Sequence, residues 1–240
     1  MLFISPPFGN YLNLPKTTPI KGSFTLEPRP GLLGQIYKTL YYSKEQGGWV
    51  NKIGLRNKGI DFAIDKYKNS WFPFYRNSVI SIAILHENEI DKFIEKIPPD
   101  MSLEINVSCP NVNHTLVSQK LNGFLNPERK WCSIKLGPKT TNKEIRDYYN
   151  EGFRTFHCSN TLPVEDGGLS GPSLIPYTWN LTKHIKETYP DTIIISGGGI
   201  QTLETVDLYK NTGADHVSIS SVCFHPWKFV SFYSLYCFHH

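Results

Sequence analysis

The stretch LEINVSCPN (Leu103–Asn111) runs from a predicted β-strand directly into a polar loop. Ile105 and Val107 favour an extended backbone, and Pro110 ends the strand because proline has no N–H to donate to a neighbouring strand. Two asparagines and a thiol therefore lie where a strand meets a loop.

This combination of side chains suits a flat, polar ligand. Asparagine amides both donate and accept hydrogen bonds, as a pyrimidine or an isoalloxazine ring requires. The Cys109 thiol can remove a proton from a substrate once its pKa falls below the usual value of about 8.5. The alternative is that Cys109 is a buried residue at a strand end, since free cysteine often packs as a small hydrophobic side chain.

Similar apolar runs recur along the whole chain, each followed by a polar or glycine-rich break. The predicted strands are Leu2–Ser5, Ile20–Leu26, Val79–Leu85, Leu103–Ser108, Ser133–Leu136, Thr155–Ser159, Thr192–Ser196 and His216–Ser220. Segments with helical spacing are Glu87–Ile97, Asn142–Glu151, Leu174–Thr188 and Thr202–Asn211. Strands that alternate with helices predict a parallel sheet, and eight of them predict a compact (β/α)₈ (TIM) barrel.

Two units of this barrel depart from the regular pattern. The prolines and the glycine between Ser5 and Ile20 exclude a helix, so we expect the first helix to be missing or replaced by a loop. Gly48–Asn57 is predicted to form an extra hairpin-like excursion in the second unit. The aromatic segment Trp227–Phe238 is interpreted as a last helix that docks on the barrel, with an exposed, sticky terminus as the alternative.

Composition narrows the class of protein further. The chain has 240 residues, 40% of them hydrophobic, which predicts a single domain over residues 1–240. The net charge of +4 is spread along the chain and predicts no nucleic-acid surface. Five cysteines without a C-x-x-C pair indicate free thiols in a reducing compartment, hence a cytoplasmic protein. We expect no signal peptide, no membrane span and no metal site.

Further chemistry-bearing motifs follow the later strands, where barrels of this kind carry their active sites. Lys135 lies among apolar strand residues and should meet an anionic or electron-rich ligand, or else pair with a carboxylate such as Glu104. His157–Thr161 is a polar cluster at a strand end. Gly167–Gly171 and Gly197–Gly199 would let backbone N–H groups approach a phosphate, with Ser220–Ser221 beside them.

In this order, the segments resemble the dihydroorotate dehydrogenase family of FMN-binding barrels. The matching motifs are GSFT (Gly22–Thr25), NKIGLRN (Asn51–Asn57), NVSCPN (Asn106–Asn111), IKL (Ile134–Leu136), SNT (Ser159–Thr161), GGLSG (Gly167–Gly171), GGGI (Gly197–Ile200) and GAD (Gly213–Asp215). The resemblance implies oxidation of dihydroorotate to orotate in pyrimidine biosynthesis, with FMN as the cofactor.

The resemblance also implies a role for individual residues. Cys109 would be the base that takes the proton from C5, while a hydride leaves C6 for N5 of the flavin. The substrate contacts would be Asn51, Gly54, Leu55, Asn106, Asn111, Asn160 and Thr161. The cofactor contacts would be Ser23, Lys135, Gly171, Gly198, Gly199, Ser220 and Ser221. A homodimer stays open as the assembly state.

The chain departs from the family pattern in its first unit. That region often supplies a flavin-contacting lysine, but the motif alignment places Gly22 at the position, and Lys21 one residue earlier would face the other side of the strand. The segment after Asn111 is also short. A cysteine base and the lack of membrane-docking helices favour fumarate or another small electron acceptor over a membrane quinone.

Two alternatives to this function stay open. One is flavin chemistry on a related pyrimidine such as uracil, which the asparagines would tolerate. The other is a flavin-binding protein that has lost turnover, to which the missing first helix points.

Overall fold

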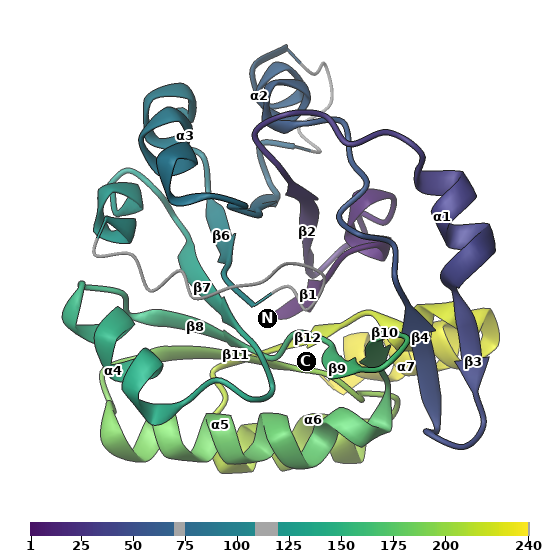
Figure 1. Ribbon diagram of the computed structural model, residues 1–240. Coiled ribbons are helices and arrows are strands. Elements are labelled where there is room, and N and C mark those ends of the chain that lie inside the picture. Colours follow the sequence, from purple (N-terminus) through teal and green to yellow (C-terminus); the bar gives the residue numbers. More distant parts are fainter. Residues whose placement is uncertain (70–74, 109–119, 240) are drawn as a thin grey trace.

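Eight parallel strands close into a barrel in the computed structural model of this protein, which describes residues 1–69, 75–108 and 120–239 (Figure 1). The neighbours around the barrel are, in order, β1 (Leu2–Ile4), β12 (His216–Ile219), β11 (Ile193–Gly197), β8 (Thr155–Cys158), β7 (Cys132–Leu136), β6 (Leu103–Asn106), β5 (Val79–Ile82) and β2 (Thr17–Phe24). All eight predicted strands and the predicted (β/α)₈ barrel are therefore confirmed.

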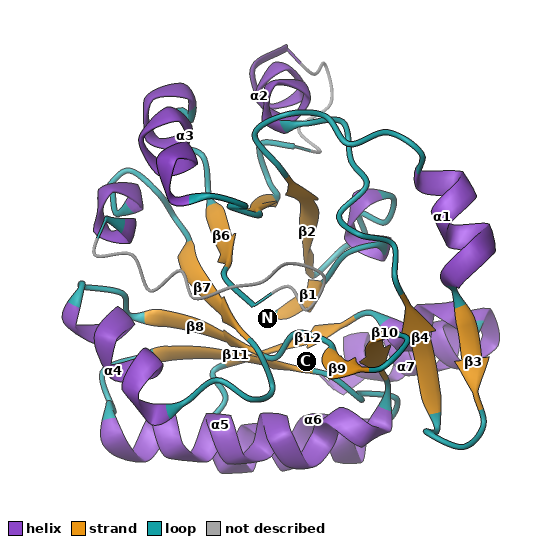
Figure 2. Ribbon diagram, viewed as in Figure 1, coloured by secondary structure: helices purple, strands orange, loops and turns teal. Residues whose placement is uncertain are grey.

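Helices follow most of these strands and lie outside the barrel (Figure 2). They are α1 (Leu32–Thr39), α2 (Ile60–Asn69), α3 (Ile90–Lys96), α4 (Asn142–Asn150), α5 (Ile175–Thr188), α6 (Leu203–Thr212) and α7 (Pro226–His239). Short 3₁₀ helices are η1 (Phe8–Asn10), η2 (Glu87–Glu89), η3 (Leu121–Phe124), η4 (Pro172–Leu174) and η5 (Ser221–Phe224). The five helices that the sequence predicts, α3 to α7, are present, whereas α1 and α2 lie outside its prediction. Among the described helices none is both long and apolar enough to cross a membrane.

The first unit lacks an α-helix, as the sequence predicts. Only η1 stands between β1 and β2, and its carbonyl groups at Gly9 and Asn10 accept hydrogen bonds from Lys21 Nζ at 3.0 and 3.4 Å. Helix α7 packs against this segment, because Phe229 and Tyr233 share an apolar cluster with Phe8. The prediction of a docked C-terminal helix is confirmed.

A second, four-stranded sheet stands beside the barrel in the order β3 (Tyr41–Ser43), β4 (Gly48–Asn51), β10 (Gly167–Ser170) and β9 (Leu162–Val164) (Figure 1). The predicted excursion over Gly48–Asn57 is confirmed in part, because the hairpin β3–β4 contains only Gly48–Asn51 of that range. Gly167–Ser170 of the glycine motif is strand β10, which pairs with β4, and only Gly171 of the motif follows the strand. Gly167 is required there by close packing, because its φ is +135° and a Cβ would lie 2.2 Å from the Asn51 carbonyl oxygen.

Strand alternation separates two faces of the barrel wall. Outward residues such as Ile105, Ile134 and Phe156 are buried in the large cluster beneath the helices. Inward residues near the amino ends of the strands form a small apolar cluster, made of Phe3, Ile20, Val79 and Ile195. Toward the carboxyl ends the inward positions become polar, and this half of the barrel holds the candidate site.

Candidate functional site

A cavity opens at the carboxyl ends of the barrel strands. Its wall comes from the ends of β1 and β7 and from the segments that follow β8, β10, β11 and β12. Eight residues that the sequence predicts for the site line this cavity: Lys135, Asn160, Thr161, Gly171, Gly198, Gly199, Ser220 and Ser221. Ser5, Pro6 and Ser218 join them without having been predicted, as does Ser159, which the sequence placed only in the polar cluster His157–Thr161.

The glycines of this wall are required by close backbone packing. Gly198 and Gly199 have φ values of +94° and +80°, which L side chains rarely adopt. A Cβ on Gly199 would lie 2.6 Å from Ile175 Cγ1 and 3.0 Å from the Gly171 carbonyl oxygen. The backbones after β10 and β11 therefore meet at one side of the cavity, leaving a wall of main chain and small polar side chains that suits an anionic group such as a phosphate.

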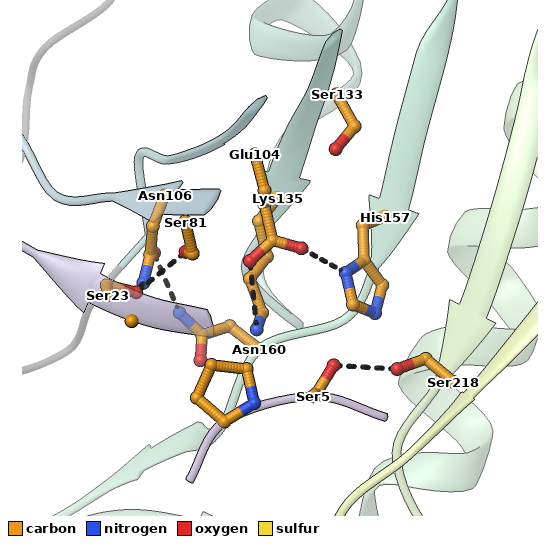
Figure 3. A network of polar contacts seen from close by, with 12 residues as sticks. Ser5, Ser23, Ser81, Glu104, Asn106, Ser133, Lys135, His157, Asn160 and Ser218 are labelled. Carbon is orange, nitrogen blue, oxygen red and sulfur yellow. Dashed lines mark hydrogen bonds and ion pairs between the residues drawn. The ribbon is translucent and has the colours of Figure 1, made fainter. Parts of the chain in front are cut away.

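A chain of hydrogen bonds links the predicted asparagines to the interior of the barrel (Figure 3). Asn160 Nδ2 donates to Asn106 Oδ1 at 3.0 Å, and Asn106 Nδ2 donates to Ser23 Oγ at 3.0 Å. Ser23 Oγ lies 2.8 Å from Ser81 Oγ. Because each amide is held by its neighbour, the orientation of Asn160 at the cavity wall depends on residues of β2, β5 and β6.

Beside this chain, three ionisable side chains meet inside the barrel (Figure 3). Glu104 Oε1 lies 3.5 Å from Lys135 Nζ, so the ion pair that the sequence offered as an alternative for Lys135 is present. Glu104 Oε2 lies 2.5 Å from His157 Nδ1. Lys135 both pairs with Glu104 and lines the cavity.

Protonation states in this group follow from burial and charge. Burial raises the pKa of Glu104, but Lys135 and His157 outweigh it and bring that pKa to about 2. Burial lowers the pKa of His157, Lys135 lowers it further, and Glu104 opposes both, with a lowered pKa as the result. We therefore assign an ionised Glu104 and a neutral His157 whose Nδ1–H donates to the carboxylate.

Other predicted site residues do not line the cavity. Ser23 acts in the hydrogen-bond chain, and Asn51 on β4 donates from Nδ2 to the Gly168 carbonyl oxygen at 3.4 Å. Gly54 accepts a hydrogen bond from Arg29 Nε at 3.2 Å, and Leu55 has a φ of +56° in the same loop. The predicted base Cys109 and the predicted substrate contact Asn111 lie outside the described residues.

Sequence reasoning named Glu104 only as a possible partner of Lys135 and His157 only within a polar cluster at a strand end, and it assigned neither to the site. The signal that could have found them is the alternation of the strands. Glu104 is two residues before Asn106 on β6, and two residues apart on a strand means the same face. A charged residue at an inward barrel position, where branched apolar side chains are usual, marks a functional layer.

Comparison with known proteins agrees with this geometry. The family model described as dihydroorotate dehydrogenase matches residues 11–127. The catalytic subunit of dihydroorotate dehydrogenase B (NAD⁺) from Staphylococcus carnosus is 26% identical over 210 residues, which is 76% of this chain and 68% of that protein. Dihydroorotate dehydrogenase A (fumarate) from Limosilactobacillus reuteri is 26% identical over 216 residues, covering 74% of this chain and 68% of the relative.

A solved structure gives the corresponding result for the fold. Ligand-free DHODH from Eimeria tenella superposes with a TM-score of 0.69 over 95% of this chain and 80% of that one, at 18% identity. The chain spans about two thirds of the length of the two bacterial relatives.

Proposed function

Because this chain belongs to the dihydroorotate dehydrogenase family, we propose that it is an FMN-dependent oxidoreductase that converts dihydroorotate to orotate in pyrimidine biosynthesis. The observation that carries the proposal is the cavity itself. One wall is built from backbone and small polar residues, another presents amides, and Lys135 lies where strand β7 reaches the cavity. These are the groups needed for a phosphate, a polar ring and an electron-rich edge.

The phosphate of the cofactor would be held by the loops that meet at Gly171, Gly198 and Gly199. Ser220 and Ser221 complete this wall. The Ser220 hydroxyl donates to the Pro6 carbonyl oxygen at 2.9 Å, so its side chain fixes the cavity wall and its contribution to the phosphate would come from the backbone. Lys135 would face the ring system, where its positive charge stabilises negative charge in the reduced state.

The substrate ring would be oriented by the amides. Asn160 and Asn106 are already bonded to each other, and Thr161 N donates to Asn160 Oδ1 at 2.9 Å, so little reorganisation is needed on binding. Asn51, Asn111, Gly54 and Leu55 are proposed to complete the substrate contacts by resemblance to the family. When bound, FMN supplies the hydride acceptor, and the protein supplies geometry and proton transfer.

Cys109 is the proposed base that takes the proton from C5 of dihydroorotate. It follows Ser108, whose Oγ donates to the Lys135 carbonyl oxygen at 2.9 Å. The end of β6 is thereby fixed to the end of β7 directly before the thiol. For the oxidative half of the cycle we propose fumarate or another small acceptor, and the two named relatives use NAD⁺ and fumarate according to their names.

The first experiment is an absorbance spectrum of the purified protein, followed by anaerobic addition of dihydroorotate. We expect flavin bands that bleach. Positioned acid–base groups contribute about 10²–10⁴-fold to rate, so Cys109→Ala should keep the bands but slow bleaching by about a hundredfold or more.

Cys132→Ala is the matched control, because Cys132 contacts the Phe124 carbonyl group away from the cavity and burial raises the pKa of its thiol. A protein that neither contains FMN nor takes it up would contradict the proposal. Flavin bands that neither dihydroorotate nor orotate perturbs would favour a protein without turnover, and tighter binding of uracil than of orotate would favour a different substrate. Unchanged bleaching in Cys109→Ala would remove that residue from the mechanism.

A further inference from the structure

The inward side chains of the barrel change from apolar to charged and polar toward the carboxyl ends of the strands. Below the cavity, the inward positions of three neighbouring strands are occupied by Glu104 on β6, Lys135 on β7 and His157 on β8, with exposed fractions of 0%, 7% and 1%. Barrels of this architecture usually fill these positions with branched apolar residues. Only the deeper layer here follows that rule, with Phe3 and Ile20 among its members.

Stability does not account for this charged layer. Burying an ion pair removes two charges from water, and well-packed apolar residues in the same place are often as stable or more stable. The charges also lie next to the cavity, since Lys135 contributes to its wall. A role in the neighbouring site is therefore the better explanation for the charged layer.

The geometry separates the three side chains into a fixed pair and a shared cation. His157 Nδ1 and Glu104 Oε2 are 2.5 Å apart, a short, charge-assisted hydrogen bond that fixes the carboxylate. Lys135 Nζ is 3.5 Å from Oε1, beyond the 2.7–2.9 Å typical of such a bond. The ammonium group is thus held by attraction to the carboxylate without being locked onto it, and it can serve a ligand in the cavity as well.

The charges of the three groups cancel. Glu104 carries one negative charge, Lys135 one positive charge, and the neutral His157 ring none. In the low-dielectric interior of the barrel, a carboxylate this close offsets much of the field that the ammonium would otherwise exert on a ligand.

We propose that Glu104, oriented by His157, is a positioning residue that holds Lys135 at the cavity wall and moderates its positive charge, thereby setting the reduction potential of the bound flavin. This inference rests on the proposed function, because it assigns the residues beneath the same cofactor. Glu104 acts through Lys135 and is not itself a catalytic residue.

The test is the midpoint potential of the FMN-loaded protein, measured by equilibration with a reference dye during anaerobic reduction. Glu104→Gln keeps the shape of the side chain and removes its charge, so the cavity becomes more favourable to the electron-rich reduced ring. We expect the reduction equilibrium to shift at least tenfold toward the reduced form, which is about 30 mV upward for a two-electron couple. Lys135→Met should shift it in the opposite direction.

Two further variants separate charge from structure. Glu104→Asp retains the negative charge and should lie closer to the original potential than Glu104→Gln does. Ser133→Ala changes an inward, buried residue of the same strand as Lys135, whose Oγ contacts the Leu103 carbonyl oxygen, and should leave the potential unchanged. If Glu104→Gln does not fold, the double variant Glu104→Gln with Lys135→Met removes both charges. Its potential is compared with that of Lys135→Met alone and should be the higher of the two.

The outcomes distinguish the two proposals. If Glu104→Gln leaves the reduction equilibrium within twofold of the original, or shifts the potential downward, the role of Glu104 is overturned. The oxidoreductase function stays intact in that case. The same conclusion follows if Glu104→Asp and Ser133→Ala move the potential as far as Glu104→Gln does. A protein that never takes up FMN would overturn the function and this inference together.

Discussion

The role of Lys21 depends on the face of strand β2 to which its side chain points. Ile20 faces the interior of the barrel, so Lys21 faces outward, toward η1 rather than toward the cavity. The side chain is 3% exposed, and its described hydrogen bonds run to the carbonyl groups of Gly9 and Asn10. The expectation that Lys21 would face away from a flavin agrees with this placement.

The burial of Lys21 predicts an effect of pH on stability. Burial lowers the pKa of Lys21 to about 8, below the value of 10.5 for a lysine in the unfolded chain. Between these two pH values the unfolded state binds more protons than the folded state, so the free energy of unfolding increases as the pH rises. The cost of burying the charged Lys21 is present at pH 7 and disappears once the buried amine is neutral. The free energy of unfolding of the original protein minus that of Lys21→Met should therefore rise by about 2 kcal/mol between pH 7 and pH 10.

Urea titrations of the two proteins at both pH values measure this difference. Lys139→Met, at an exposed position, provides the comparison. A difference that stays constant, or falls with pH, would contradict the depressed pKa of Lys21.

Among the elements, α4 and α6 offer a matched pair of helix N-termini. Each begins after a threonine with an extended backbone, Thr141 and Thr202. Thr141 Oγ1 accepts from Glu144 N at 3.3 Å, and Glu144 Oε2 accepts from Thr141 N at 2.7 Å, which together form a capping box. Thr202 makes no such bond to the backbone of α6.

We therefore expect Thr141→Ala to lower the free energy of unfolding by about 1 kcal/mol, because it leaves a backbone N–H of the first turn without its partner. Thr202→Ala should cost less than about 0.5 kcal/mol. Chemical denaturation of both variants gives the comparison. Equal losses at the two positions would show that the capping box contributes nothing specific.

At the scale of the whole molecule, α7 compensates for the missing first helix. It follows the last strand of the barrel, yet it packs against the segment that links the first two strands. Tyr233 OH donates to the Pro15 carbonyl oxygen at 2.8 Å, and Lys16 Nζ donates to the Cys237 carbonyl oxygen at 3.0 Å. The segment that links β1 and β2 is thus covered by the last helix of the chain.

This docking predicts a large difference between two phenylalanines of α7. Phe232 is 3% exposed in the cluster that joins α7 to the barrel, whereas Phe238 is 86% exposed. Phe232→Ala should lower the free energy of unfolding by about 3–5 kcal/mol, because it removes the contacts of a buried ring and leaves a cavity. Phe238→Ala should change it by less than about 0.5 kcal/mol. Similar values for the two variants would contradict the docked arrangement of α7.

The sequence by itself determined the barrel, the absence of the first helix and half of the cavity wall. These features depend on local patterns, since an apolar run predicts a strand wherever it lies and the carboxyl ends of parallel strands gather at one end of a barrel. Lys135, Asn160 and Gly199 could be assigned to the cavity for that reason. Helix α1 could not be predicted in this way, because none of its side chains is fully buried and its sequence contains Gly34.

Only the tertiary structure decided which polar groups meet. The pairing of β10 with β4 joins residues 117 positions apart, and Glu104 reaches His157 across 53 positions. Such contacts depend on the closure and the register of the barrel, in which a shift of one residue turns every side chain to the other face. A local pattern contains no information about register between distant strands, so the partners of Glu104 at His157 and of Lys21 at Gly9 became known only once the sheet had closed.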